Sequence, residues 1–281
     1  MPSGLRIVST ALNLPGPVAC ARLRALGAEI DKVEPPDGDP LERYAPRWYG
    51  RLHEGIAVHR LDLKGDAGRD SMSRLLGRAD VLITAQRPAA LARMGLDVAA
   101  LSAHPRLCHV AITGHGAPDE NLPGHDLTYV AACGLVQPPH LPPTLFADMA
   151  GGERAATEAL ALVNARERGA GARSATVALA DVAHDLAAPL REGLTAPGGV
   201  LGGRLAGYNL YDTAEGWIAL AALEPRFVER LAEALCVAPP THERLAAKFA
   251  ERTAREWEEW ASANDVPLVA VRSPLNEKTK S

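Results

Sequence analysis

The 281-residue sequence predicts an α/β fold in which a large domain with a parallel sheet is followed by a smaller α+β domain. Short apolar runs of strand length alternate with helix-like segments through most of the chain, and this order is typical of a parallel sheet. The chain opens with a strand, a loop, a helix and a second strand joined by short connections. A Gly- and Pro-rich segment later interrupts the alternation, and a hairpin and helices follow it.

The opening unit carries clear local signals. Residues 5–9 (LRIVS) are predicted to form a buried strand, and residues 13–17 (NLPGP) a loop with strong turn chemistry. A helix is expected over 18–26 because Gly27 is a good C-terminal cap, and a second strand over 29–33. The loop after the first strand does not read GxGxxG, so the dinucleotide-binding fingerprint is absent.

The rest of the large domain continues the same alternation. After an irregular segment at 34–40, strands are predicted at residues 56–63, 79–84, 107–113 and 174–179, and helices at 67–76, 148–166 and 180–190. The strand predicted at 107–113 (LCHVAIT) is expected to be buried, like the first strand of the chain. The Gly-Ala-Gly run at 169–171 is expected to end the longest helix.

The smaller domain is set apart by a change of pattern. Residues 193–203 (GLTAPGGVLGG) are the predicted linker, so the predicted domains are 1–192 and 204–281. The second domain is expected to contain hairpin strands at 208–212 and 217–221, helices at 227–235, 243–249 and 252–262, and a last strand at 266–271.

Bulk composition narrows the class of protein. Hydrophobic residues make up 47% and charged residues 23%, which is ordinary for a globular protein, and the net charge of −4 argues against a nucleic-acid partner. No apolar run has membrane-spanning length and no signal peptide is evident, so a cytoplasmic protein without a membrane partner is expected. The four cysteines are scattered through apolar contexts and are predicted to be buried free thiols.

Two residues are candidates for proton transfer. His125, in the segment GHD, and Asp148, in LFADMAGG, each stand at a predicted helix start, and an imidazole and a carboxylate together make a plausible acid/base pair. Each also has a purely structural interpretation, because histidine and aspartate at helix starts often act as caps. Glu224, which precedes Pro225, is a weaker candidate that is otherwise an ordinary first-turn acid.

Basic residues suggest where an anionic ligand could bind. Arg87 lies just after a predicted strand, at the edge where open α/β sheets bind their ligands. A basic stretch from Arg43 to Arg60 is either a solvated loop or a patch for a ligand such as a phosphate. No HExxH, paired CxxC or EF-hand pattern occurs, so no metal is predicted, and GxSxG and Walker-type phosphate loops are also absent.

A series of motifs along the chain resembles the family III CoA-transferases, the group that includes α-methylacyl-CoA racemase. The similar segments, in order, are GLRIVST with LPGP, LRALGAEIDKVEPPDGDP, LDLKG, ADVLITAQRPAALARMGLD, HPRLCHVAITGHG, PGHDLTYVAACGL, LFADMAGG, YDTAEGWIALAALEPRF and TAREWEEWASANDVPLVAVRSPLNE. The resemblance covers nearly the whole chain. It implies a Rossmann-like large domain, a small α+β domain and an interlocked homodimer with the active site between subunits.

The resemblance also implies roles for single residues. Asp148 matches the aspartate that is the acyl-accepting nucleophile in the transferases and one of two acid/base groups in the racemases. His125 matches the histidine of the racemases' GHD segment, which typical transferases lack, and Asp126 in the same segment would lie near the thioester. Glu224 matches a racemase glutamate, and Arg87 a contact to coenzyme A or the thioester.

These matches define the predicted ligand and function. The substrate is expected to be an acyl-CoA thioester, with coenzyme A as part of the substrate and no permanently bound cofactor; Arg43 and Arg60 are expected to join Arg87 and Asp126 in binding it. The leading hypothesis is an acyl-CoA epimerase that removes and returns the α-proton of a 2-methylacyl-CoA. Backbone N–H groups at the two helix starts would stabilise the enolate oxygen. The alternatives are a CoA-transferase that uses Asp148 as nucleophile, and a diverged non-catalytic CoA-binding protein.

Overall fold

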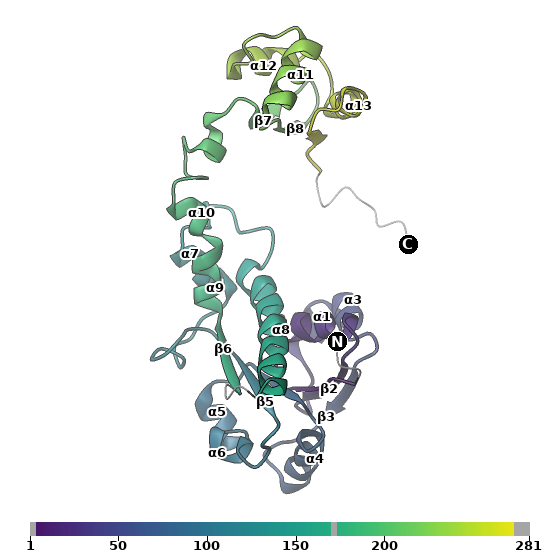
Figure 1. Cartoon of the computed structure of the whole chain (residues 1–281), viewed down its shortest axis with the longest axis vertical. Coiled ribbons are helices and arrows are strands. Elements are labelled where there is room, and N and C mark those ends of the chain that lie inside the picture. The colour runs from purple at the N-terminus through teal and green to yellow at the C-terminus, as the bar shows by residue number, and fades with distance from the viewer. Residues whose placement is uncertain (1–3, 170–172, 273–281) are drawn as a thin grey trace. The chain divides into compact units, whose positions relative to one another are not determined.

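A computed structural model describes residues 4–169 and 173–272 of the chain, which divides into two compact units, Met1–Ala187 and Ala188–Ser281. The predicted α/β class, with a parallel sheet in a larger part and a small α+β part, is confirmed (Figure 1). The segment 193–203, predicted as a linker, belongs to the second unit. Residues 170–171 of the predicted helix break, and the C-terminal motif from residue 273 onwards, lie outside the described residues.

The first unit is built on a six-stranded sheet with the order β3-β2-β1-β4-β5-β6, and all of its strand pairs are parallel. The strands are β1 (Arg6–Ser9), β2 (Glu29–Glu34), β3 (Ala57–Arg60), β4 (Val81–Thr84), β5 (Cys108–Thr113) and β6 (Ser174–Ala178). The first three strands extend the sheet in one direction from β1 and the last three extend it in the other from β4. The order therefore reverses between β1 and β4, where open α/β sheets form a crevice at their carboxyl ends.

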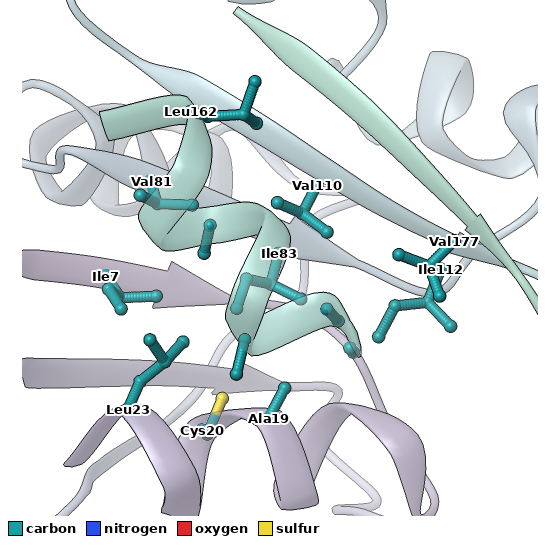
Figure 2. Close-up of a cluster of buried hydrophobic side chains, with 14 of the residues drawn as sticks. Ile7, Ala19, Cys20, Leu23, Val81, Ile83, Val110, Ile112, Leu162 and Val177 are labelled. Atoms are coloured by element: carbon teal, nitrogen blue, oxygen red, sulfur yellow. The ribbon is translucent and has the colours of Figure 1, made fainter. Parts of the chain in front are cut away.

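Helices cover both faces of this sheet. They are α1 (Pro15–Ala25), α2 (Pro40–Tyr44), α3 (Pro46–Leu52), α4 (Asp66–Leu76), α5 (Pro88–Arg93), α6 (Val98–Leu101), α7 (Asp126–Ala132), α8 (Phe146–Glu167) and α9 (Leu179–Leu186). Figure 2 shows Ile7, Ile83 and Val110 of the strands facing α1 and α8. Alternate strand residues point to the opposite face; Val8 and Leu82 accordingly pack there with residues of α4 and α5.

The long helix α8 approaches α1 closely because its buried side is made of small residues. Gly152 has no room for a side chain, since a Cβ atom there would lie 2.7 Å from the carbonyl oxygen of Pro15 and from Val18. Ala155, Ala156 and other small residues continue this face of α8. The close packing of α1 against α8 places the first turn of α8 beside the loop that follows β1.

The second unit contains an antiparallel sheet in the order β7-β8-β9 and a set of short helices. Its elements are α10 (Ala188–Arg191), the π-helical turn η1 (Val200–Arg204), β7 (Tyr208–Asp212), β8 (Trp217–Ala221), α11 (Pro225–Leu235), α12 (His242–Phe249), α13 (Ala254–Asn264) and β9 (Leu268–Ala270). The fully buried Trp257 is central to its core, and the indole N–H of Trp257 donates to the carbonyl oxygen of Phe249. The predicted hairpin is found at the predicted residues.

Several local predictions need correction. The first helix begins at Pro15, not Val18, because proline is well suited to the first helical turn. Residues that were expected to be irregular or solvated form α2 and α3, which also start at prolines. Of the cysteines, Cys20 and Cys108 are buried and Cys133 is partly buried, but Cys236 is exposed because it lies at the left-handed C-cap of α11. No helix of the described chain has the length and apolar character to cross a membrane.

Candidate active site

A pocket of about 280 Å³ lies at the carboxyl edge of the six-stranded sheet, where the strand order reverses. The segments after β1, β4 and β5 contribute Asn13, Arg87 and Gly114 to its wall, and the starts of α7 and α8 contribute His125 and Asp148. Parallel strands end at one edge of a sheet, so residues far apart in the sequence converge there. The predicted pair His125 and Asp148 therefore lines one pocket together with Arg87.

Asp148 is the third residue of α8 and is not the N-cap, which is Leu145. Its backbone N–H donates to Oδ1 of Asp126, 22 residues earlier, at 2.9 Å. Burial, and secondarily the negative charge of Asp126, raise the pKa of the Asp148 carboxyl from 3.8 to about 7. Asp148 is therefore present in both its protonated and its ionised form near neutral pH, as a group that gives and takes protons requires.

His125 is the N-cap residue of α7, and its side chain is exposed at the mouth of the pocket. The hydroxyl of Thr128 donates to the backbone carbonyl of His125 at 2.7 Å and accepts the backbone N–H of His125 at 3.1 Å. These two bonds hold the backbone of the first turn of α7. The neighbouring Asp126 is buried, and its carboxylate points to α8, not to solvent.

Arg87 is the N-cap residue of α5 and its guanidinium is exposed at the pocket wall. Throughout residues 4–169 and 173–272 it makes no hydrogen bond or ion pair, so its donors are available to a ligand. The other predicted basic residues are placed differently. Arg60 pairs with Glu42 at 2.8 Å, and neither Arg60 nor Arg43 lines this pocket. Glu224 belongs to the second unit, where it is the N-cap residue of α11.

A second cavity, of about 390 Å³, lies at the same edge of the sheet beside the ends of β1, β2 and β3. It shares Leu12 with the first pocket, and its wall includes Glu34, Lys64 and Gln86. Glu34 is buried and its Oε2 atom has no hydrogen-bond partner among the described residues. A buried polar atom without a partner is uncommon, and this one belongs to a side chain with no exposed surface.

Sequence reasoning missed a buried ionic cluster behind these cavities. The ammonium of Lys32 lies 2.5 Å from Oδ2 of Asp39, 2.9 Å from Nε2 of His53 and 3.3 Å from Oε1 of Glu34. His53 donates from Nδ1 to the carbonyl oxygen of Tyr49, so Nε2 accepts from Lys32. Burial and the charge of Lys32 lower the pKa of His53, which favours this neutral form. The charged residues of this strand did not indicate that Lys32 is buried, because two of its partners, Asp39 and His53, lie outside the strand.

The cluster bears on both metal binding and the shape of the pocket. Glu34, Asp39 and His53 form the one group in the described part of the chain with the spacing of metal ligands, and the positive charge among them is that of Lys32. Oδ1 of Asp39 accepts the backbone N–H of Asn13 at 3.0 Å. Asn13 has a φ of 64° and lines the first pocket. The cluster therefore helps to hold the loop after β1, with Asn13 in the left-handed region that asparagine tolerates, beside the candidate catalytic residues.

The fold and the pocket define a class: a doubly wound α/β protein with a candidate ligand pocket at the switch point of its sheet. Comparison with known proteins identifies the family. The model of CoA-transferase family III matches residues 3–278, and the chain belongs to this family.

Named relatives include both activities suggested by the sequence. Cinnamoyl-CoA:phenyllactate CoA-transferase of Clostridium sporogenes is 34% identical over an alignment covering 60% of this chain and 47% of that protein, so the chain matches about half of its length. The probable fatty acyl-CoA transferase Rv3272 of Mycobacterium tuberculosis is 27% identical, over 93% of this chain and 80% of that one. Alpha-methylacyl-CoA racemase of Mus musculus is 28% identical over an alignment that covers 90% of this chain and 73% of that protein.

A solved structure shows the same architecture. The crystal structure of Rv3272 from Mycobacterium tuberculosis superposes with a TM-score of 0.82 at 26% identity, covering 96% of this chain and 84% of that chain. The family match and the named relatives put the chain among enzymes of the transferase or isomerase kind.

Proposed function

We propose that the protein is an acyl-CoA epimerase that inverts the α-carbon of a 2-methylacyl-CoA thioester. The observation that carries this proposal is the convergence of His125 and Asp148 on one pocket, with the pKa of Asp148 raised to about 7. Epimerisation needs one group to remove the α-proton and another to deliver a proton to the opposite face. An exposed imidazole and a carboxyl that titrates near neutral pH supply those two functions.

Epimerisation consists of two proton transfers through an enolate intermediate. One group takes the α-proton, the electrons of the carbon–hydrogen bond move into the thioester, and its oxygen becomes an enolate oxygen. The second group then protonates the α-carbon from the other face. Asp126 contributes indirectly, since it fixes the first turn of α8 through the Asp148 N–H and helps to raise the pKa of that carboxyl. Glu224, which matches a racemase glutamate, is proposed as a third catalytic residue.

The coenzyme A part of the substrate is proposed to extend from this pocket into the second cavity through the shared residue Leu12. Lys64 there offers a cation to a nucleotide, and Arg87 offers unpaired donors to a phosphate or to the thioester. Arg43 and Arg60 are proposed as outlying phosphate contacts. The functional assembly is proposed to be a homodimer, and a monomer by light scattering at micromolar concentration would count against it.

The second candidate function is CoA transfer, which is favoured by relatives that are named CoA-transferases. In that reaction a carboxylate oxygen of Asp148 bonds to the thioester carbonyl carbon, the carbon–sulfur bond breaks, and the CoA thiolate leaves with the electron pair. The CoA thiolate then attacks the Asp148 carbonyl carbon of this anhydride, which releases the donor acid as a carboxylate and leaves an aspartyl-CoA thioester. An added carboxylate repeats these steps in reverse and departs as the new CoA thioester. This chemistry needs Asp148 ionised and gives His125 no part in the bond changes.

The test is the uptake of deuterium at the α-carbon of each enantiomer of a 2-methylacyl-CoA in heavy water, with CoA transfer to an added carboxylate measured in parallel. In an epimerase, His125→Ala should stop net inversion but leave exchange on the face served by Asp148. Asp148→Asn should give the mirror pattern with the other enantiomer. Loss of an acid/base group typically costs about 10²–10⁴ in rate.

Matched controls are His140→Ala and Asp119→Asn, because both residues are exposed and neither lines the pocket. In a transferase, Asp148→Asn alone would abolish turnover, and hydroxylamine would trap the acylated wild-type carboxyl. Full activity of His125→Ala would contradict the epimerase.

Arg87→Ala should weaken thioester binding by about 1.5–3 kcal/mol, the range for a hydrogen bond to a charged group. An unchanged Kd would show that Arg87 contacts no ligand.

A further inference from the structure

The epimerase needs hydrogen-bond donors for the oxygen on which negative charge develops, and the two helix starts supply fewer than expected. The N–H of Asp148 is already bonded to Asp126, and the N–H of His125 is bonded to Thr128. Two side-chain hydroxyls in the same pocket have no such partner. They belong to Tyr129 on α7 and Thr113 at the end of β5.

The hydroxyl of Tyr129 lies in a narrow space between two glycines. Tyr129 is only 3% exposed, and its ring belongs to the buried core of the unit. A Cβ atom on Gly114 would lie 2.4 Å from the Tyr129 hydroxyl oxygen, and one on Gly124 would lie 2.7 Å from it. Any residue other than glycine at these two places would displace the hydroxyl. Within the described residues this hydroxyl makes no hydrogen bond, although Tyr129 lines the pocket.

Thr113 directly precedes Gly114 and lines the same pocket. Its Oγ1 atom is buried and has no hydrogen-bond partner in the part of the chain that the structure describes. Leaving a buried hydroxyl unpaired costs about 1–3 kcal/mol, and such groups in native proteins commonly serve a ligand or a reaction. The unpaired Thr113 hydroxyl and the Tyr129 hydroxyl, both from residues that line this pocket, point to an acceptor atom brought by the ligand.

We propose that the hydroxyls of Tyr129 and Thr113 are catalytic donors that bind the thioester carbonyl oxygen and stabilise the negative charge it acquires. The proposal rests on the proposed function, and it names the part of the site that receives the charge. Donors fixed before the reaction cost no reorganisation when the charge forms, which is why such groups accelerate reactions of carbonyl compounds. The same oxygen would carry the charge if Asp148 attacked the carbonyl carbon, so the two hydroxyls fit either chemistry.

The surroundings keep the tyrosine in its donor form. Burial raises the pKa of Tyr129, the nearby charges of Asp148 and Asp126 raise it further, and Arg87 opposes them. The phenol is therefore protonated over the working pH range of an enzyme of this kind.

The test compares two ligands that differ in one oxygen: a 2-methylacyl-CoA thioester, and the CoA thioether with the same carbon skeleton and a methylene in place of the carbonyl. The variants are Tyr129→Phe and Thr113→Val, which keep the ring and the branched shape. Calorimetry should show wild type binding the thioester more tightly than the thioether. Each variant should lose about 2- to 10-fold in affinity for the thioester, as expected for one hydrogen bond, and nothing for the thioether.

The rate provides a second measurement. Each variant should lower the rate constant of α-proton exchange by about 10²–10³, the cost typical of one missing oxyanion donor. Tyr44→Phe is the control, because the same atom is removed from an exposed residue that lines neither cavity. Equal losses for both ligands would show a structural role and overturn the proposal, as would full retention of thioester affinity and rate. If wild type shows neither exchange nor transfer, the proposed function fails, while the comparison of the two ligands still decides the role of the hydroxyls.

Discussion

Asp148→Asn should stop net epimerisation and at the same time stabilise the first unit, increasingly so as the pH rises. The pKa of the Asp148 carboxyl is raised from 3.8 to about 7 in the folded chain, so the folded state keeps a proton that the unfolded state has already lost. The free energy of unfolding of the wild type must therefore fall as the pH rises from 3.8 to about 7, and it stays low above pH 7. An uncharged amide has no such dependence.

The size of the effect follows from the two pKa values. They differ by about three, and each pKa unit corresponds to about 1.36 kcal/mol, so the full cost of ionising Asp148 in the pocket has a ceiling of about 4 kcal/mol. About two thirds of that ceiling, roughly 2.7 kcal/mol, develops between pH 5 and pH 8. Because the pocket is open to water, the expected gain of Asp148→Asn over wild type across this interval is about 1–2.5 kcal/mol.

Hydrogen exchange of the slowest amides in β1, β4 and β5 measures the free energy of unfolding of this unit separately from the second one. The protection of wild type and Asp148→Asn is compared at pH 5 and pH 8 after correction for intrinsic exchange. Asp119→Asn, which changes an exposed acid in the same unit, should show no pH-dependent difference from wild type. A difference between Asp148→Asn and wild type that is constant with pH, or that shrinks as pH rises, would refute the argument.

Three further predictions concern packing and burial. Lys32→Met should lower the free energy of unfolding, measured by urea titration, by about 3–5 kcal/mol, because the buried carboxylates lose their cation. A loss below about 1 kcal/mol would show that water replaces the lysine ammonium. Gly152→Ala should lower the free energy of unfolding by about 1–3 kcal/mol, although alanine has the better helix propensity, because the alanine Cβ would lie 2.7 Å from atoms of α1. A higher melting temperature in a thermal scan would contradict this. A thiol reagent should modify exposed Cys236 in the native protein but Cys20 and Cys108 only after unfolding; rapid native reaction of all three would disprove the burial.

The regular parts of this fold could be predicted from local pattern. Strand β4 is buried at every position, and its continuous apolar run is what a strand covered on both faces requires. The hairpin of β7 and β8 was predicted at its observed residues because apolar and polar positions flank a turn that contains Gly216. Helices α2 and α3 were missed, since they are short, carry few apolar residues and start at prolines that also suggest a loop.

The site was predictable only in part, because its properties depend on partners distant in sequence. Motif resemblance singled out His125, Asp148 and Arg87, and all three line one pocket. Nothing local indicates that Asp126 accepts the N–H of Asp148, since the two lie on different helices. In the same way, Lys32 stands in a strand whose charged letters suggest exposure, yet it is fully buried among partners from other elements.

The environment of Asp148 bears directly on the choice between the two chemistries. A nucleophilic carboxylate is useful only when ionised, so a transferase that depends on Asp148 should gain activity with pH and level off above about 7.

An epimerase needs one of His125 and Asp148 to be protonated and the other unprotonated, since one must be the base while the other is the acid in each direction. Its rate should therefore pass through a maximum and fall on both sides. Burial and the neighbouring Asp126 raise the pKa of Asp148, so a transferase has much of its nucleophile protonated at neutral pH. In an epimerase the same shift lets Asp148 both accept and donate a proton near neutral pH. Asp126→Asn removes the charge and should move the acid limb of either profile to lower pH; an unmoved limb would mean that Asp126 does not act on the carboxyl that reacts.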